Sequence, residues 1–167
     1  EEGCIIIDVD CVTDSEPDNN FTERAVTVNP DDALKGAEHL TVAGTTVYVC
    51  CDAGLVAVDI QDPLAPKIAA TVAMNSPTSV AVQFRYAFVT DAEGLKIVDV
   101  TVPAKMQRVG ELVAMADARN VYVAREYAYV AAGNEGVAIV DVTIPTKPRL
   151  VMHYDAEGRF GDANQVK

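Results

Sequence analysis

The apolar residues of this chain fall into short runs of Val, Ala and Ile, and Gly, Pro or acidic residues separate one run from the next. Small and branched side chains alternate within the runs, a pattern typical of strands whose sheets pack face to face. Apolar residues at helical spacing are not seen over any window of about ten positions. The pattern therefore predicts an all-β protein.

One phrase recurs along the chain, a Gly followed five residues later by an Asp with an apolar run between them. It reads EGCIIIDV from Glu2, AGLVAVDI from Ala53, EGLKIVDV from Glu93 and EGVAIVDV from Glu135. Successive copies are 51, 40 and 42 residues apart, a period found in propeller blades and in helical repeats. Since helical spacing is absent, the period favours a propeller.

The last three copies of the phrase are flanked by the same predicted strands and turns. Each follows two short strands joined by a tight turn, and each precedes a Pro turn that leads into one more strand. A complete unit is thus four strands in about 41 residues, the anatomy of a propeller blade. The prediction is a single β-propeller, or a segment of one, over residues 1–167. Its parts are a partial blade at 1–36, full blades at about 37–75, 76–115 and 116–156, and the start of another blade at 157–167.

The Gly and the Asp of the repeated phrase both have structural interpretations. The Gly supplies a positive φ for the turn before the third strand. The Asp accepts backbone N–H bonds that hold the following turn, and an array of metal-binding carboxylates is the alternative. These residues are Gly3, Gly54, Gly94 and Gly136, and Asp8, Asp59, Asp99 and Asp141.

The third-strand phrases carry a family resemblance. Leu55–Asp59 (LVAVD), Leu95–Asp99 (LKIVD) and Val137–Asp141 (VAIVD) resemble the signature of the LVIVD-repeat proteins, and Cys4–Asp8 (CIIID) is a variant of it. The resemblance covers nearly the whole chain apart from an acidic insert at 13–24. It implies a propeller-like fold found in bacterial and archaeal proteins that are often exported or attached to the cell surface. It implies little about activity, because propellers include both enzymes and passive scaffolds.

Charge and hydropathy limit the classes of partner that the chain is expected to bind. The chain has 25 acidic and 13 basic residues and a net charge of -12, so a phosphate backbone would be repelled and nucleic acid is not an expected partner. No apolar run approaches the roughly 18 residues of a membrane span. The expected partners are other protein chains or the remainder of a longer propeller.

Four cysteines stand in the first third of the chain, and they fit neither a C-x-x-C pair nor the haem-attachment motif. Covalent haem is therefore not expected, and the two histidines lack the spacing of zinc ligands. The cysteines predict one or two disulfides in an exported protein. The alternative is that they are buried, reduced thiols of a cytosolic protein. The sequence does not determine which cysteines would pair. The disulfide candidates are Cys4, Cys11, Cys50 and Cys51.

The insert at 13–24 interrupts the repeat and carries two candidate sites. Its alternating oxygen donors resemble a calcium loop loosely. A Pro stands inside it, no Gly stands at its turn and no bidentate Glu follows at the twelfth position, so a solvated surface loop is the alternative. Calcium is the one cofactor that the sequence leaves open. Asn20 also begins an Asn-Phe-Thr glycosylation sequon. The candidate calcium ligands are Asp14, Glu16, Asp18 and Asn20.

A polar residue precedes each innermost strand and could line the mouth of a central channel. These residues are His39, Ser79, Asn120 and Gln165. They form a candidate ligand site, and the alternative is ordinary solvation at a strand entrance. Only His39 could act as a base, and no catalytic partner stands at a recognisable spacing from it, so no catalytic residue is predicted.

Together these features predict a non-enzymatic scaffold that mediates protein–protein interaction or structural assembly, outside the cell, at its surface or in the periplasm. The alternative is a ligand-binding or enzymatic propeller whose site lies at the channel mouth or on blades outside this chain. Because the first strand reads as the third strand of a blade, the chain is expected to be a fragment of a longer polypeptide. The second possibility is that another subunit closes the propeller.

Overall fold

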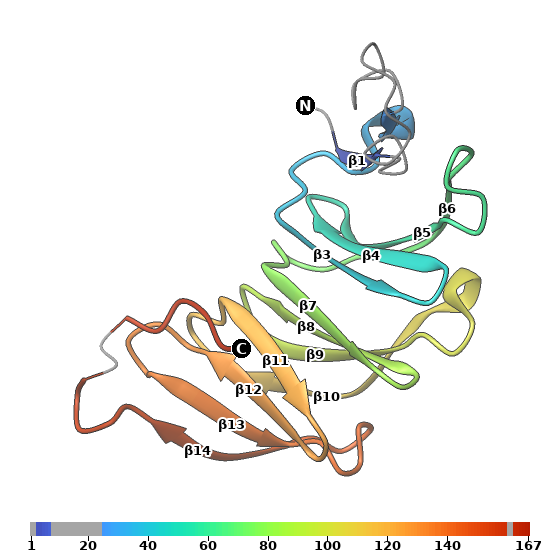
Figure 1. Cartoon of the computed structure of the whole chain (residues 1–167). Coiled ribbons are helices and arrows are strands. Elements are labelled where there is room, and N and C mark those ends of the chain that lie inside the picture. The colour runs from blue at the N-terminus through green and yellow to red at the C-terminus, as the bar shows by residue number, and fades with distance from the viewer. Residues whose placement is uncertain (1–2, 8–24, 160–161) are drawn as a thin grey trace, which may run out of the picture.

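The computed structural model describes residues 3–7, 25–159 and 162–167. Within these residues the chain forms strands, two short 3₁₀ turns and no α-helix. Three four-stranded antiparallel sheets follow one another after an N-terminal two-stranded hairpin (Figure 1). In each four-stranded sheet the strands pair in chain order, as in a propeller blade. The all-β propeller prediction is confirmed.

The hairpin and the three blades account for all the described strands, whose bounds are as follows. The N-terminal hairpin consists of β1 (Cys4–Ile7) and β2 (Ala25–Val28). The first blade consists of β3 (His39–Ala43), β4 (Thr46–Cys51), β5 (Gly54–Asp59) and β6 (Lys67–Val72). The second blade consists of β7 (Ser79–Gln83), β8 (Tyr86–Asp91), β9 (Gly94–Asp99) and β10 (Gln107–Ala114). The third blade consists of β11 (Asn120–Ala124), β12 (Tyr127–Ala131), β13 (Val137–Asp141) and β14 (Arg149–Tyr154). The 3₁₀ turns are η2 (Pro30–Asp32) and η3 (Pro103–Lys105).

The glycine before each third strand permits a close backbone approach. Gly94 has φ +136°, and a Cβ there would lie 2.2 Å from the carbonyl oxygen of Val113 on β10. Gly54 repeats this geometry in the first blade, where a Cβ would lie 2.2 Å from the carbonyl oxygen of Val72. The third and fourth strands of a blade can therefore pair closely only if this position has no side chain.

The core consists of three apolar layers, one between each pair of neighbouring sheets. Tyr48, 2% exposed, belongs to the layer between the first and second blades. Phe88, also 2% exposed, fills the equivalent place between the second and third blades. Tyr129 occupies the matching position on the outer face of the third blade and is only partly buried. Each blade thus depends on the next one to cover its aromatic residue.

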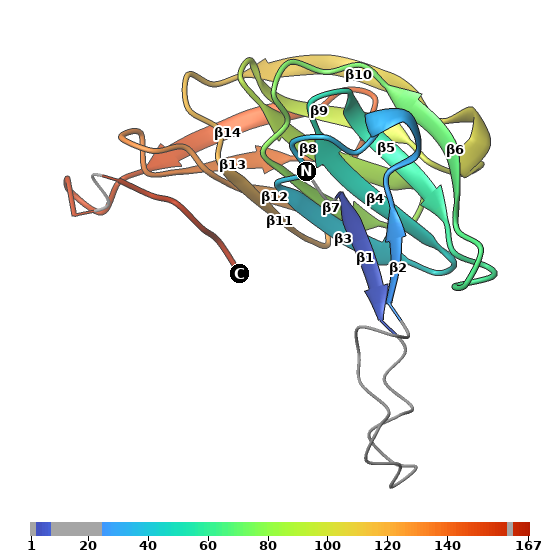
Figure 2. The same ribbon diagram turned by 90° about the horizontal axis from the view of Figure 1, so that it is seen from above.

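The innermost strands β3, β7 and β11 contact one another along the row of blades. Figure 2 shows them on one side of the row, with the outermost strands β6 and β10 on the other. The first and third turns of every blade fall at one end, because successive strands are antiparallel. We call this end the hairpin-turn end. The opposite end, where each innermost strand begins, is the strand-entry end.

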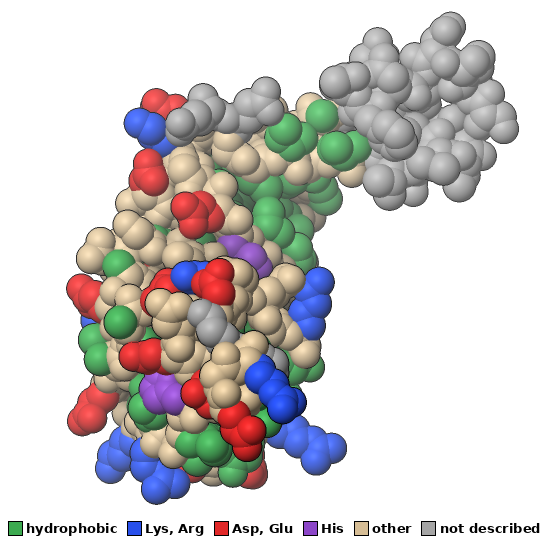
Figure 3. All heavy atoms as spheres, turned by 90° about the vertical axis from the view of Figure 1, so that its left-hand side faces the viewer, with side chains coloured by type: hydrophobic (Ala, Val, Ile, Leu, Met, Phe, Trp, Pro, Cys, Tyr) green, Lys and Arg blue, Asp and Glu red, His purple; other side chains and the backbone are tan. Residues whose placement is uncertain are grey.

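Acidic and basic side chains are interspersed on the face of the molecule shown in Figure 3, and apolar atoms lie between them.

A search of the described residues finds no helix with the length and hydropathy to cross a bilayer.

Candidate functional site

The polar residues at the start of the innermost strands contact the next blade. The Nδ1 atom of His39 accepts a hydrogen bond of 3.2 Å from the backbone N–H of Val80. Val80 lies on β7, an edge strand whose alternate N–H groups face away from β8. The imidazole therefore satisfies a backbone donor of the next blade.

The same relationship recurs at the following junctions. The Oγ atom of Ser79 lies 3.4 Å from the N–H of Val121, which donates to it, and 3.0 Å from the side-chain amide of Asn120. Asn120 in turn accepts a hydrogen bond of 3.0 Å at Oδ1 from the N–H of Val166. His39 and Ser79 therefore each link one blade to the next, and Asn120 links the third blade to the segment 162–167, a geometry that differs from a row of free groups around a channel. Gln165, the fourth member of the predicted set, is exposed.

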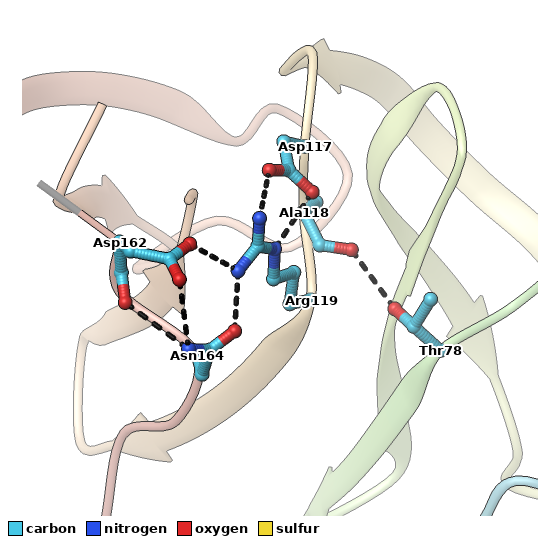
Figure 4. Close-up of polar contacts among 6 residues, drawn as sticks. All are labelled: Thr78, Asp117, Ala118, Arg119, Asp162 and Asn164. Carbon is cyan, nitrogen blue, oxygen red and sulfur yellow. Dashed lines mark hydrogen bonds and ion pairs between the residues drawn. The ribbon is translucent and has the colours of Figure 1, made fainter. Parts of the chain in front are cut away.

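Arg119 forms a polar cluster with Asp117, Asp162 and Asn164 at the strand-entry end (Figure 4). Its guanidinium donates to both carboxylate oxygens of Asp117, at 2.9 and 2.6 Å. Its Nη1 atom lies 2.5 Å from Asp162 Oδ1 and also donates to the Asn164 side chain. The hydrogen bond from Arg119 lowers the pKa of Asp117, and the bonds to Asp117 and Asp162 raise the pKa of Arg119.

This Arg119 cluster ties the segment 162–167 to the third blade. Gly133 and Ala163 exchange backbone hydrogen bonds of 3.2 and 3.0 Å. A Cβ on Gly133 would lie 2.0 Å from Asp117 Oδ2, so the carboxylate occupies the space that a side chain would fill. On the other side, Thr78 donates a hydrogen bond of 2.9 Å to the carbonyl of Ala118 (Figure 4). The cluster and the neighbouring Ala118 therefore connect the second blade, the third blade and the segment 162–167.

A second charged cluster is buried in the second blade. Lys96 is 4% exposed and Asp91 is fully buried. The Lys96 ammonium donates to Asp91 and lies 2.7 Å from Glu93 Oε2, and Asp91 also accepts the backbone N–H groups of Asn75 and Glu93. Burial opposes the charge on Lys96, but hydrogen bonds to Asp91 and Glu93 outweigh it and raise the pKa of the amine. A protonated amine is a poor nucleophile, so this cluster fits an ion-pair role.

Sequence reasoning did not single out Lys96 or Arg119. The signal for Lys96 was a charged residue at the second position of the third-strand phrase, where the other full blades have Val56 and Ala138. Arg119 gave no comparable signal, because an Arg two residues after a turn Asp is ordinary on a protein surface.

The Asp at the end of each third strand accepts a hydrogen bond from the backbone N–H two residues later. These bonds measure 2.9 Å for Asp59, 2.9 Å for Asp99 and 3.0 Å for Asp141. The hydroxyls of Thr101 and Thr143 donate to the same carboxylates, and these hydrogen bonds lower the pKa of Asp99 and Asp141. Such carboxylates hold the turn into the outermost strand. Asp8 lies outside the described residues.

Three of the four cysteines are free thiols, and all three are buried. Cys50 and Cys51 lie in different apolar layers, on opposite faces of β4. Burial, followed by the neighbouring Cys51 and Glu38, raises the pKa of Cys50 to about 12. The disulfide prediction is not confirmed, since Cys4, Cys50 and Cys51 are unpaired and Cys11 lies outside the described residues.

The insert at 13–24 also lies outside the described residues, so calcium binding by Asp14, Glu16, Asp18 and Asn20 and glycosylation of Asn20 stay predictions. In the part of the chain that is described, no three His, Cys, Asp or Glu side chains are grouped as metal ligands.

Consecutive four-stranded antiparallel sheets, joined through their innermost strands, define a protein of the β-propeller class. Residues 36–73, 76–112 and 116–156 match the LVIVD repeat, and the chain belongs to that family. The match covers the three blades in turn.

Among solved structures, the chain is similar to PorZ of Porphyromonas gingivalis, described as an essential bacterial surface component of the type-IX secretion system. The TM-score is 0.55 at 16% identity, over 80% of this chain and 19% of PorZ, so this chain spans about a fifth of the PorZ chain. A weaker likeness, with a TM-score of 0.35 and 16% identity over 77% of this chain and 53% of the other, is to apo AztD from Citrobacter koseri. No curated protein matches the sequence. At this identity the likeness to PorZ shows the fold alone.

Proposed function

We propose that this chain is part of an exported or cell-surface β-propeller that acts as a non-enzymatic scaffold for protein–protein interaction. The observation that supports the proposal is that the polar side chains at the start of the innermost strands are engaged in hydrogen bonds. His39 and Ser79 each accept a backbone hydrogen bond from the next blade, and Asn120 accepts one from Val166 in the segment that follows the third blade. Groups engaged in this way hold the blades together, which leaves the turns at the two ends as the surfaces for binding.

The hairpin-turn end offers apolar contacts for a partner. Leu64, Phe84 and Ile144 are 69, 93 and 56% exposed and stand on turns at this end of the three blades. Single exposed apolar residues are normal on a soluble protein, but a recurrence at one end favours contact with another protein.

The outer face of the third blade fits a different partner, another blade of the same kind. Tyr122, Tyr129, Ile139 and Met152 form one row across its four strands, and Tyr122 and Met152 are 45 and 46% exposed. The equivalent row of the second blade is covered by the third blade. Val166 already donates to Asn120 as Val121 does to Ser79. The further blade would begin its innermost strand at this point, in the same polypeptide or in another.

Labelling of intact cells with a membrane-impermeant biotin ester tests the location. Lys67, Lys105 and Lys147 are exposed at the hairpin-turn end, whereas Lys96 is buried and serves as the internal control. We expect the three exposed lysines to be labelled on intact cells that produce the protein naturally. In a parallel sample treated with a membrane-impermeant bifunctional ester in place of the biotin ester, we expect cross-links from the same lysines to a second protein. Labelling only after lysis would overturn an extracellular location. Turnover or ligand binding that depends on His39 would favour the enzymatic or ligand-binding alternative.

A further inference from the structure

Phe84 stands where the fold alone would favour glycine. It occupies the two-residue turn between β7 and β8, its φ is +55°, and its side chain is 93% exposed. At the same turn position the first blade has Gly44, with φ +61°, and the third blade has Arg125, with φ +56°. A bulky residue in the left-handed region is unfavourable, and so is an aromatic ring in water. Nothing in the packing of the described residues offsets either cost, and backbone strain of this kind is often found at functional positions.

A groove of about 510 Å³ lies beside Phe84, between the second and third blades. Phe88, Val142 and Pro145 contribute its apolar lining. The turns around it are fixed in place, because Gln83 donates a side-chain hydrogen bond of 2.7 Å to the carbonyl of Arg125. The wall formed by Pro145 packs against Gly110 of β10, where a Cβ would lie 2.8 Å from the Pro145 carbonyl oxygen. The groove is therefore pre-formed.

Two arginines border the groove, although the chain as a whole carries a net charge of -12. Arg85 lies 5.1 Å from the centroid of the Tyr86 ring and 3.8 Å from Asp99, and its side chain is 60% exposed. Arg125 also borders the groove and has no ion-pair partner among the described residues. Glu126 is the acidic residue of the lining. Two guanidinium groups beside an apolar floor complement a carboxylate next to a large apolar side chain.

We propose that this groove, the Phe84 groove, binds an extended acidic peptide segment of a protein partner. A large apolar side chain of the peptide packs against Phe84 and the groove floor, and a neighbouring Asp or Glu pairs with Arg125 or Arg85. This proposal rests on the scaffold function and adds the site and the chemistry of the partner. An aromatic anchor flanked by arginine is the residue pattern that dominates many protein interfaces.

Fluorescence anisotropy with a defined set of labelled ten-residue peptides tests the proposal. Each probe holds one Phe or Leu and one Asp or Glu. Across the set, the acidic residue is placed in turn at each position from two residues before the apolar residue to two residues after it. Matched probes carry Asn or Gln in place of the acids, or Ser in place of the apolar residue. We expect binding by acidic apolar probes, and at least a tenfold loss for both kinds of matched probe. Equal binding of acidic and neutral probes would overturn the proposal, and so would binding of a heparin fragment to the same residues with equal affinity.

Phe84→Gly separates binding from folding, because glycine suits φ +55° better than phenylalanine. We expect its unfolding midpoint to be equal to or higher than that of the wild type, while its affinity for the acidic probes falls at least tenfold. Arg125→Ser should lower the affinity about fivefold, and Leu64→Ser, an exposed control outside the groove, should not change it. Unchanged binding by Phe84→Gly would rule out the groove. If the cross-linked partner of the lysine experiment is still captured by this variant, the scaffold function stands and only the site is wrong.

Discussion

The Nδ1 atom of His39 accepts a hydrogen bond from the backbone N–H of Val80, which lies 41 residues later in the next blade. The bond requires a neutral imidazole whose hydrogen is on Nε2. Burial lowers the pKa of His39, in keeping with this neutral state. Ser79 and Asn120 make the equivalent bonds with groups that do not titrate. Among these three links, the one between the first and second blades is therefore the pH-sensitive one.

Acidification should weaken the His39 link. Since the folded pKa lies below the unfolded value of about 6.5, the unfolded chain binds a proton first as pH falls. The stabilisation is complete above about pH 6.5 and is lost progressively below it. We expect the free energy of unfolding in urea to be lower at pH 5.5 than at pH 7.5, by up to about 1 kcal/mol, the usual contribution of one hydrogen bond. His39→Asn supplies a neutral acceptor, as Asn120 does in the third blade, and should remove most of this difference.

His153 is the matched control for this experiment, because it is the second histidine of the chain and lies on β14, away from the junction. His153→Asn should leave the difference between the two pH values in place. If His39→Asn retains the whole difference, the His39 link is not the pH-sensitive element.

Two glycines with positive φ should differ sharply in their tolerance of alanine. Gly94→Ala places a Cβ 2.2 Å from a backbone oxygen of β10, which can yield only if the strands separate. We expect it to lower the free energy of unfolding by about 3 kcal/mol or more. Gly44→Ala meets no atom within 4 Å and should cost only about 1 kcal/mol for its left-handed backbone. Equal costs in urea denaturation would show that the close approach of β9 and β10 contributes nothing.

Local pattern in the sequence accounts for most of the fold. The strands follow from alternating apolar runs and their turns from Gly, Asp and Pro, because both depend on residues a few positions apart. The four-strand period then identifies the blade, since each unit must bury its faces against the next.

The links between blades could not be predicted in the same way. The sequence identified His39, Ser79 and Asn120 as polar residues at one repeat position, but their backbone partners lie 41, 42 and 46 residues away. Which atom of the next blade meets each side chain depends on the stacking of the sheets. The exposure of Phe84 and the pairing of Arg119 with Asp162 depend on the same long-range arrangement.

The buried pair of Lys96 and Asp91 should show strong coupling in a double-mutant cycle. Lys96→Val alone leaves the carboxylate of Asp91 buried without its counter-charge and should lower the free energy of unfolding by about 3 kcal/mol. The double variant with Asp91→Cys introduces the residues that the first blade has at these positions, Val56 and Cys51. It should cost less than the sum of the single changes, although the N–H groups of Asn75 and Glu93 lose an acceptor. Additive single effects would contradict a direct interaction between the two charges.

Removal of the Arg119 guanidinium should loosen the segment 162–167. Because Arg119 is one-third exposed, solvent screens its ion pairs and the contribution of the cluster to global stability is small, as for other surface ion pairs. We expect Arg119→Ala to raise the amide exchange rates of Ala163 and Val166 about fivefold, since their N–H groups bond to Gly133 and Asn120. Arg149→Ala, which removes an exposed guanidinium from β14, should leave both rates unchanged. If Arg119→Ala also leaves them unchanged, the segment is held by the backbone pairing of Gly133 with Ala163 and by the Asn120 amide, without a contribution from the ion cluster.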